Sequence, residues 1–238
     1  MEQGMSVLHR GLVLLAMGMM AALLVGCGSN KLGKMEWVQT RTDTPRVGVV
    51  YAIRGWSGVF SAGIDNIAKG AREKGVTAHI YMPEQHLELC ETIVNKYKND
   101  RNHEPIVLVG HSRGVDASIY IARELKKIGV KVALIAAIDS VDETIVPSNV
   151  EICHNYWIHG YFPGTNLLRG IALEKEKGST GRLYNYYVPK DAPDLIGPLT
   201  NHVDLDDQPK LQARIVEHIL EVCVERSKWR PRTAPAKP

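Results

Sequence analysis

The sequence predicts a doubly wound α/β fold whose central sheet is mostly parallel and has about six strands. Six short runs rich in aliphatic and β-branched residues recur from Arg46 onward. The first four are nearly continuous in apolar character, as strands buried on both faces of a parallel sheet are. Segments with helical periodicity lie between them. Strands and helices that alternate at this spacing require right-handed crossovers, which build a doubly wound sheet.

Each expected element rests on its own periodicity. The strands are short apolar runs, and the helices show apolar residues every three or four positions, which form one buried stripe. The expected strands are residues 46–53, 77–82, 105–110, 130–138, 150–157 and 182–188, and the four helical stripes comprise Ile64, Ile67, Ala68 and Ala71, then Cys90, Ile93, Val94 and Tyr97, then Val115, Ile119, Ala122 and Leu125, and finally Leu211, Ile215 and Ile219.

These elements are predicted to form one globular domain, residues 46–225. The chain has 238 residues, of which 45% are hydrophobic and 23% charged, enough for a full core. Residues 27–45 are polar and without sustained periodicity, which predicts a tether. Residues 226–238 are basic and rich in proline, which predicts a disordered tail; a solvated tail without a role is favoured over contact with anionic lipid.

Residues 1–26 have the features of a signal peptide. Arg10 precedes an apolar run of about fifteen residues, which is shorter than the roughly twenty residues that a membrane-spanning helix needs. The run ends in Leu24-Val25-Gly26-Cys27, which resembles the bacterial lipobox, where cleavage occurs before a diacylated cysteine. An uncleaved anchor helix is the alternative.

Cleavage there would leave Cys27 as the first residue, carrying acyl chains that hold the protein on a membrane of the bacterial cell envelope. One acyl chain binds marginally, whereas several anchor a protein stably. Gly28 and Ser29 follow, without an aspartate at the second position. In a Gram-negative bacterium this pattern implies the outer membrane, with the domain facing the periplasm.

Charge and motif content argue against several classes of partner. The net charge is +3, and no cluster of Lys and Arg interleaved with aromatic residues marks a nucleic-acid surface. Neither a glycine-rich dinucleotide fingerprint nor a Walker-type loop follows a predicted strand, so we expect no cofactor.

The cysteines and histidines do not predict a metal site. His154 and His159 stand five residues apart, so in one extended strand they would point to opposite faces, and neighbouring Cys153 adds no metal-ligand spacing. Two alternatives stay open for Cys90, Cys153 and Cys223: one disulfide with one buried thiol, or three thiols packed in the core.

The pentapeptide Gly110-His111-Ser112-Arg113-Gly114 follows the third strand and opens the third helix. It matches G-x-S-x-G, a weak signal alone that gains weight from the buried strand before it and the helix after it. In so tight a turn, side chains at both flanking positions would clash with the backbone. The glycines therefore predict a strained turn that presents Ser112 as a nucleophile.

A serine nucleophile needs a base to take its proton and a carboxylate to orient that base. His202 lies between the last strand and the closing helix, whereas His218 lies inside that helix. Asp139 ends the fourth strand, and a carboxylate directly after an apolar strand is costly unless it has a role. A buried strand also holds it rigidly. The other aspartates stand in surface turns or near the closing helix: Asp142, Asp191, Asp194 and Asp204.

The order and spacing of the segments GWSG, GHSRG, AID, VPSNVEICHNY and NHVDL resemble small bacterial α/β-hydrolases of the lipase or thioesterase type, many of them exported. The resemblance covers Val47 to Val224. It implies that Ser112 is the nucleophile, Asp139 the acid and His202 the base. Many members carry the acid after the next strand, where this chain has no equally well-placed aspartate.

Acyl transfer also needs hydrogen-bond donors for the developing oxyanion. We expect the backbone N–H of Arg113 to be one and the loop after the first strand, near Gly55 and Trp56, to supply the other. Trp157, Tyr161 and Phe162 follow the fifth strand and either wall an acyl pocket or pack in the loop.

These features together predict a serine hydrolase that cleaves carboxylic esters or thioesters of small molecules or lipids through an acyl-enzyme. Only about ten residues separate the fourth and fifth strands, where larger lipases carry a helical lid, so we expect a minimal lid or none. The alternative is a non-catalytic envelope lipoprotein that keeps the fold and acts as a binding module.

Overall fold

The central element is a parallel sheet of six strands, seen in a computed structural model that describes residues 43–56, 61–100, 102–159 and 170–231. The strand order is β2-β1-β3-β4-β6-β8, and every pair of neighbours is parallel. The predicted doubly wound sheet is confirmed. The strands are β1 Val49–Ile53, β2 Thr77–Tyr81, β3 Ile106–His111, β4 Leu134–Ile138, β6 Ile152–Trp157 and β8 Arg182–Tyr187.

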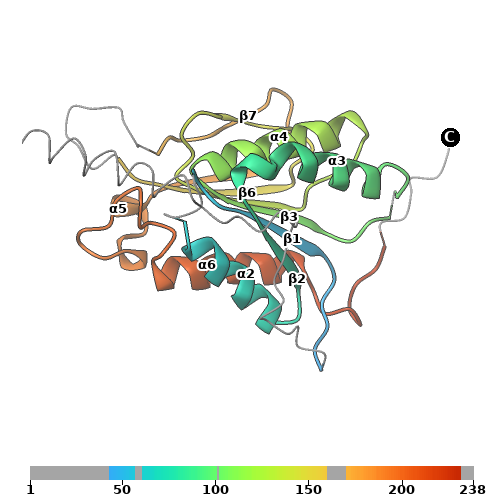
Figure 1. Ribbon diagram of the computed structural model, residues 1–238, viewed down its shortest axis with the longest axis horizontal. Coiled ribbons are helices and arrows are strands. Elements are labelled where there is room, and N and C mark those ends of the chain that lie inside the picture. Colours follow the sequence, from blue (N-terminus) through green and yellow to red (C-terminus); the bar gives the residue numbers. More distant parts are fainter. Residues whose placement is uncertain (1–42, 57–60, 101, 160–169, 232–238) are drawn as a thin grey trace, which may run out of the picture. The chain divides into compact units, whose positions relative to one another are not determined.

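Helices cover both faces of the sheet (Figure 1). Helices α2 (Gly63–Glu73) and α6 (Pro209–Val222) pack on one face, and α3 (His86–Tyr97) and α4 (Arg113–Lys127) pack on the other. Successive residues of a strand point to opposite faces. In β1, Val50 therefore joins the apolar core under α2 and α6, while its neighbour Tyr51 joins the core under α3 and α4.

The sequence pattern placed the six long strands correctly and overlooked two short ones. Strands β5 (Ile145–Val146) and β7 (Glu174–Lys175) pair with each other in a separate parallel ladder. Two residues are too few to show a periodicity. Residues 139–151, between β4 and β6, contain β5 and no helix, in agreement with the minimal lid expected there.

The remaining regular elements are short. They follow the C-terminal ends of β2 and β8, at the edge of the sheet where the site is built. They are η1 (Pro83–Gln85), α5 (Val188–Asp191) and η2 (Pro193–Leu195).

The three cysteines of the domain are free thiols. Cys90, Cys153 and Cys223 are all buried, so the alternative with three core thiols holds among the described residues. Burial raises the pKa of Cys90 to about 11 and that of Cys223 to about 12, which makes both poor nucleophiles at neutral pH.

Residues 1–42, including the predicted signal peptide and Cys27, lie outside the described residues. Within the part of the chain that the structure describes, no helix is both long and apolar enough to cross a membrane.

Candidate active site

The turn between β3 and α4 holds Ser112 in a conformation that side-chain-bearing residues rarely adopt. Its φ is 54° and its ψ is −123°. A Cβ atom added at Gly110 would lie 2.4 Å from the backbone of Gly114, and one added at Gly114 would lie 2.2 Å from the carbonyl oxygen of Ile53. Glycine is therefore required at both positions, because backbone segments meet there without room for side chains.

Ser112 is more enclosed than the sequence suggests, since only 6% of it is exposed. Its hydroxyl lies 3.1 Å from Nε2 of His202, which is itself buried. Nδ1 of His202 lies 2.7 Å from Oδ2 of Asp139. Side chains from three separate loops thus form one hydrogen-bonded chain, in the order hydroxyl, imidazole, carboxylate.

Asp139 is fixed from several directions. It follows β4 directly, has a φ of 54° and is fully buried. Its second carboxylate oxygen, Oδ1, accepts the N–H of Ile158 at 2.8 Å, and its own N–H donates to the carbonyl of Tyr156 at 2.8 Å. Burial raises the pKa of Asp139, while the hydrogen bond from His202 opposes that rise. A carboxylate held at both oxygens can orient an imidazole without moving.

Gly170 makes room for this carboxylate. A Cβ atom added at Gly170 would lie 1.6 Å from Oδ1 of Asp139, closer than any two unbonded atoms can approach. The N–H of Gly170 donates to the carbonyl of Ile158 at 3.0 Å, so the glycine is held where it is. Sequence reasoning did not find this residue, because it is far from Asp139 along the chain.

Three of the four competing aspartates have other partners. Asp142 faces Arg113 at 3.5 Å on the surface. Asp191 accepts the N–H of Tyr187 at 2.8 Å. Asp204 accepts the N–H of Asn201 at 2.6 Å, which stabilises the turn that carries His202.

The expected oxyanion donors differ in whether their backbone N–H groups already have an acceptor within the protein. Arg113 is the first residue of α4, where a backbone N–H has no acceptor within the helix. The N–H of Gly55 instead donates to Oγ of Ser61 at 2.9 Å, so this donor is already used inside the protein. Gly55 would have to release Ser61 before its N–H could serve an oxyanion, and its expected role as a donor stays a prediction. Trp56, whose side chain is 68% exposed, stands next in the same loop.

His111, which sequence reasoning did not single out, is in contact with the backbone of His202. This residue ends β3, is 2% exposed, and places Nε2 2.8 Å from the backbone carbonyl oxygen of His202. Its Nδ1 lies 2.7 Å from Oγ of Ser61 and 3.5 Å from Oδ1 of Asp206. A histidine at the end of an otherwise apolar buried strand is the sequence signal that marks it.

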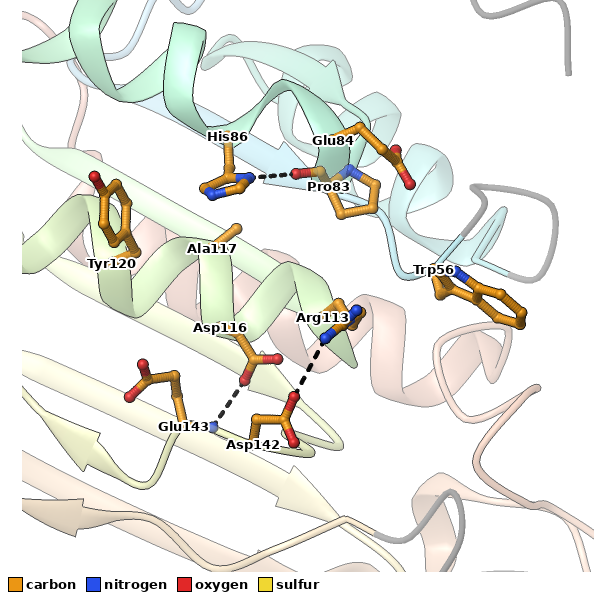
Figure 2. Close-up of a pocket in the computed structure, with 10 residues that line it drawn as sticks. All are labelled: Trp56, Pro83, Glu84, His86, Arg113, Asp116, Ala117, Tyr120, Asp142 and Glu143. Carbon is orange, nitrogen blue, oxygen red and sulfur yellow. Dashed lines mark hydrogen bonds and ion pairs between the residues drawn. The ribbon is translucent and has the colours of Figure 1, made fainter.

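A cavity of about 500 Å³ begins at Arg113, beside the turn that carries Ser112 (Figure 2). Arg113 and Trp56 stand at its end nearest the turn, and the first two turns of α4 form one wall. Its walls do not include Ser112 or His202. Carboxylates outnumber cations among the lining residues. Two of the carboxylates are held in place, because Asp142 pairs with Arg113 and Asp116 accepts the N–H of Glu143 at 2.9 Å. The lining residues are Trp56, Pro83, Glu84, His86, Arg113, Asp116, Ala117, Tyr120, Asp142 and Glu143.

The aromatic residues predicted after the fifth strand only partly fall within the described residues. Trp157 packs with His159 and Tyr187, at ring-centroid separations of 5.2 and 4.9 Å. Of the two alternatives, packing is therefore the one seen for Trp157. Tyr161 and Phe162 lie outside the described residues.

No protein-family model matches the sequence, and no curated protein sequence matches it. Solved structures with a similar chain path include a cutinase-like protein from Cryptococcus sp., at 14% identity over 76% of this chain and 97% of that chain, with a TM-score of 0.44. A second is the type II thioesterase BorB from the borrelidin biosynthetic cluster, at 12% identity over 82% of this chain and 99% of that chain, with a TM-score of 0.48.

A third solved structure is Est1E from Butyrivibrio proteoclasticus, at 10% identity over 80% of this chain and 97% of that chain, with a TM-score of 0.44. Similarities this distant carry no argument about function. The fold follows from the chain's own geometry: a six-stranded parallel sheet, a serine on a strained turn between its third strand and a helix, and that helix packed on the sheet. This protein has an α/β-hydrolase fold.

Proposed function

We propose that the protein is a serine hydrolase that cleaves carboxylic esters or thioesters through an acyl-enzyme, with Ser112, His202 and Asp139 as its catalytic triad. The observation that carries the proposal is the continuous path of hydrogen bonds from Oγ of Ser112 through the imidazole to Asp139, at 3.1 and 2.7 Å. A buried serine with only a structural role does not need a base oriented by a buried carboxylate.

In the first half of the reaction, Oγ of Ser112 attacks the acyl carbon and its proton passes to Nε2 of His202. Asp139 keeps its negative charge and stabilises the imidazolium through the Nδ1–H bond. The oxyanion of the tetrahedral intermediate accepts hydrogen bonds from the backbone N–H groups of Arg113 and Trp56. Collapse then breaks the bond to the leaving group, and His202 returns the proton to the departing alcohol or thiol.

In the second half, a water molecule replaces the alcohol or thiol. His202 takes a proton from the water as its oxygen attacks the acyl carbon of the ester on Ser112. Collapse of the second intermediate releases the carboxylic acid and returns the proton to Oγ of Ser112. Both halves balance with the groups of the protein and water alone: Ser112 supplies the nucleophile of the first half, and His202 carries the protons in both.

The surroundings of the turn favour a polar substrate over an emulsified triglyceride. The connection between β4 and β6 carries no helix that would form an apolar lid. The cavity beside Arg113 is lined by charged groups along with Trp56 and Tyr120. An acyl or leaving group that extends along α4 would therefore meet charged walls, which suits a small ester or thioester dissolved in water or presented at a membrane surface.

We also propose that the domain works on the surface of a bacterial membrane, held there by acyl chains on Cys27. The sequence Leu24-Val25-Gly26-Cys27 at the end of a short apolar run supports this location. Esters of the envelope, including lipid esters, would then be within reach of the site.

A fluorophosphonate probe tests the proposed function without knowledge of the substrate. We expect covalent labelling of wild-type protein at Ser112 and none of Ser112→Ala, followed by turnover in a panel of p-nitrophenyl esters and acyl-CoA thioesters of increasing chain length. A folded wild-type protein that neither labels nor turns over any of them would contradict the proposal and favour a binding module.

A further inference from the structure

A second chain of buried polar groups lies directly behind the base and centres on His111. Two of its contacts decide its protonation. Nε2 faces the backbone carbonyl oxygen of His202 at 2.8 Å, and a carbonyl oxygen only accepts hydrogen bonds. Nε2 therefore carries the proton and donates it to that oxygen.

The other ring nitrogen is then an acceptor if the ring is neutral. Oγ of Ser61 lies 2.7 Å from Nδ1, and its hydroxyl donates to it. The same oxygen accepts the N–H of Gly55 at 2.9 Å. The chain thus runs in one direction: the loop after β1 donates to Ser61, Ser61 donates to His111, and His111 donates to the loop that carries His202.

The neutral ring agrees with its surroundings. Burial lowers the pKa of His111 to about 3, and the nearby His202 ring acts in the same direction. Asp206, fully buried in the loop before α6, places Oδ1 3.5 Å from Nδ1. Two acceptors would repel at that distance, but burial and neighbouring Asp207 raise the pKa of Asp206 to about 7, so its carboxyl can be protonated there.

The loop that His111 contacts has no regular secondary structure from Ile196 to Gln208. Local hydrogen bonds shape it: the N–H of Asn201 donates to Asp204 at 2.6 Å, and the N–H of Val203 donates to the Asn201 side chain at 2.9 Å. These bonds fix the turn but do not fix its position relative to the sheet. Asp139 ties the loop to the end of β4 through the imidazole of His202, and His111 ties its backbone to the end of β3, next to Ser112 in the chain.

We infer that His111 is a positioning residue. Its neutral imidazole bonds to the Ser61 hydroxyl, which holds the N–H of Gly55, and to the carbonyl oxygen of His202. It thereby keeps Gly55 and the loop that carries His202 at a fixed distance from Ser112. The inference rests on the proposed function for its catalytic consequence and on the hydrogen bonds alone for its structural claim. A base shifted by about 1 Å can lose about a hundredfold in rate, which sets the size of the expected effect.

Three variants test the inference. His111→Leu removes both hydrogen bonds of the ring, whereas His111→Gln keeps an amide N–H that can reach the carbonyl of His202. His103→Leu is the matched control, because His103 lies before the opposite end of β3 and bonds to the carbonyl of Glu104. We expect kcat on a chromogenic ester to fall about a hundredfold in His111→Leu and less than about tenfold in His111→Gln, with KM changed less than about threefold in both. The control should match wild type.

A readout that does not depend on turnover accompanies the kinetics. The proton between Nδ1 of His202 and Asp139 is expected to give a downfield imidazole resonance in the proton NMR spectrum of Ser112→Ala protein. Adding His111→Leu should broaden or shift it, and adding His103→Leu should leave it unchanged. A folded His111→Leu protein with kcat within about threefold of wild type, or with the resonance unchanged, would overturn the inference.

If His111→Leu does not fold, Ser61→Ala decides the question, since it removes only the hydroxyl that bonds to Nδ1. We expect about a tenfold loss of kcat and a shifted resonance; a full rate with an unchanged resonance would overturn the inference. The proposed function fails on its own evidence if wild-type protein does not react with a fluorophosphonate. In that case the imidazole resonance still decides whether His111 positions His202.

Discussion

Oδ2 of Asp139 lies 2.7 Å from Nδ1 of His202, and the N–H of Ile158 binds the other carboxylate oxygen at 2.8 Å. One carboxylate thus connects the end of β4, the end of β6 and the loop before α6. This relationship separates Asp139 from Asp142, which pairs with Arg113 on the surface, and from Asp191 and Asp204, which bond to the backbone of their own turns.

Amidation of Asp139 should therefore have a larger effect than amidation of its rivals. Asp139→Asn is expected to lower kcat on a chromogenic ester by about a hundredfold to ten-thousandfold, because the amide favours the wrong tautomer of His202. Asp142→Asn and Asp204→Asn should each change kcat by less than about tenfold. Steady-state kinetics on the three proteins, with circular dichroism to verify folding, measures this. An active Asp139→Asn beside an inactive, folded rival variant would mean that the acid is misassigned.

Removal of the proposed nucleophile should abolish turnover while leaving the fold intact. Ser112→Ala deletes one hydroxyl from a buried site, and its expected loss of kcat is several orders of magnitude. Its melting temperature should fall by no more than about 4 °C, because a single hydrogen bond, between the hydroxyl and Nε2 of His202, is lost. Equal turnover by wild type and Ser112→Ala would place the reaction elsewhere on the protein.

Gly170 should tolerate no side chain, although it belongs to no triad. In Gly170→Ala the new methyl group would collide with Oδ1 of Asp139, so either the carboxylate or the segment after β6 has to move. We expect kcat to fall by at least about tenfold and the free energy of unfolding to fall by about 1 to 3 kcal/mol.

The matched control for this variant is Gly197→Ala, since a Cβ atom there would make only ordinary contacts, the nearest 3.7 Å away. Kinetics and denaturant titration of both variants provide the comparison. Should Gly170→Ala retain full activity and stability, the tight packing around Asp139 would be disproved.

Stability should depend on pH through Asp206. Its pKa is raised in the folded state from 3.8 to about 7, so folding favours the neutral carboxyl. This contribution to the free energy of unfolding is fully present below about pH 4 and is lost as pH rises through about 7. The total loss is up to about 4 kcal/mol. Asp206→Asn, which cannot ionise, should remove that dependence.

Urea titrations at intervals between pH 4 and pH 8 measure the effect. The free energy of unfolding of wild type should fall relative to that of Asp206→Asn across the window, and the variant should be the more stable of the two above pH 7. Parallel curves for the two proteins would show that Asp206 does not titrate in this range.

The anchor is tested by changing Cys27. Cys27→Ser should block acylation, leave unprocessed precursor and abolish lipid-dependent recovery in the membrane fraction, whereas a chain that starts near Lys34 should be soluble and folded. Mass spectrometry of the N-terminal peptide from bacterial membranes is the direct measurement. Membrane-bound protein without lipid on Cys27 would rule out the proposed anchor.

Much of the architecture could be predicted because it depends on burial along one strand or one helix face. The six long strands and the buried stripes of α2, α4 and α6 follow from periodicities of two and of about 3.6 residues. Strands β5 and β7 are not predicted by the sequence, because a strand of two residues shows no periodicity.

The site was predictable only as far as local sequence describes it. The turn around Ser112 is encoded by its two glycines, and Asp139 by an apolar strand that ends in a carboxylate. Contacts between distant segments leave no such local mark: Gly170 against Asp139, Ser61 against His111, and Gly63 against the backbone of Asp206. The bond from the N–H of Gly55 to Ser61, six residues further along, is likewise not visible in the sequence pattern.

Ser112 and Asp139 share one further property, a φ of 54° in each. For a residue with a Cβ atom, this conformation costs on the order of 1 to 3 kcal/mol, and glycine would relieve it. A sequence optimised for thermal resistance alone would gain from glycine in place of Ser112 and lose the hydroxyl, whereas the two hydrogen bonds of the Asp139 carboxylate oppose the same exchange at position 139. The end of β3 is therefore the place where directed evolution for heat tolerance should most readily yield robust but inactive proteins, so a screen for stabilised variants needs activity as a second criterion.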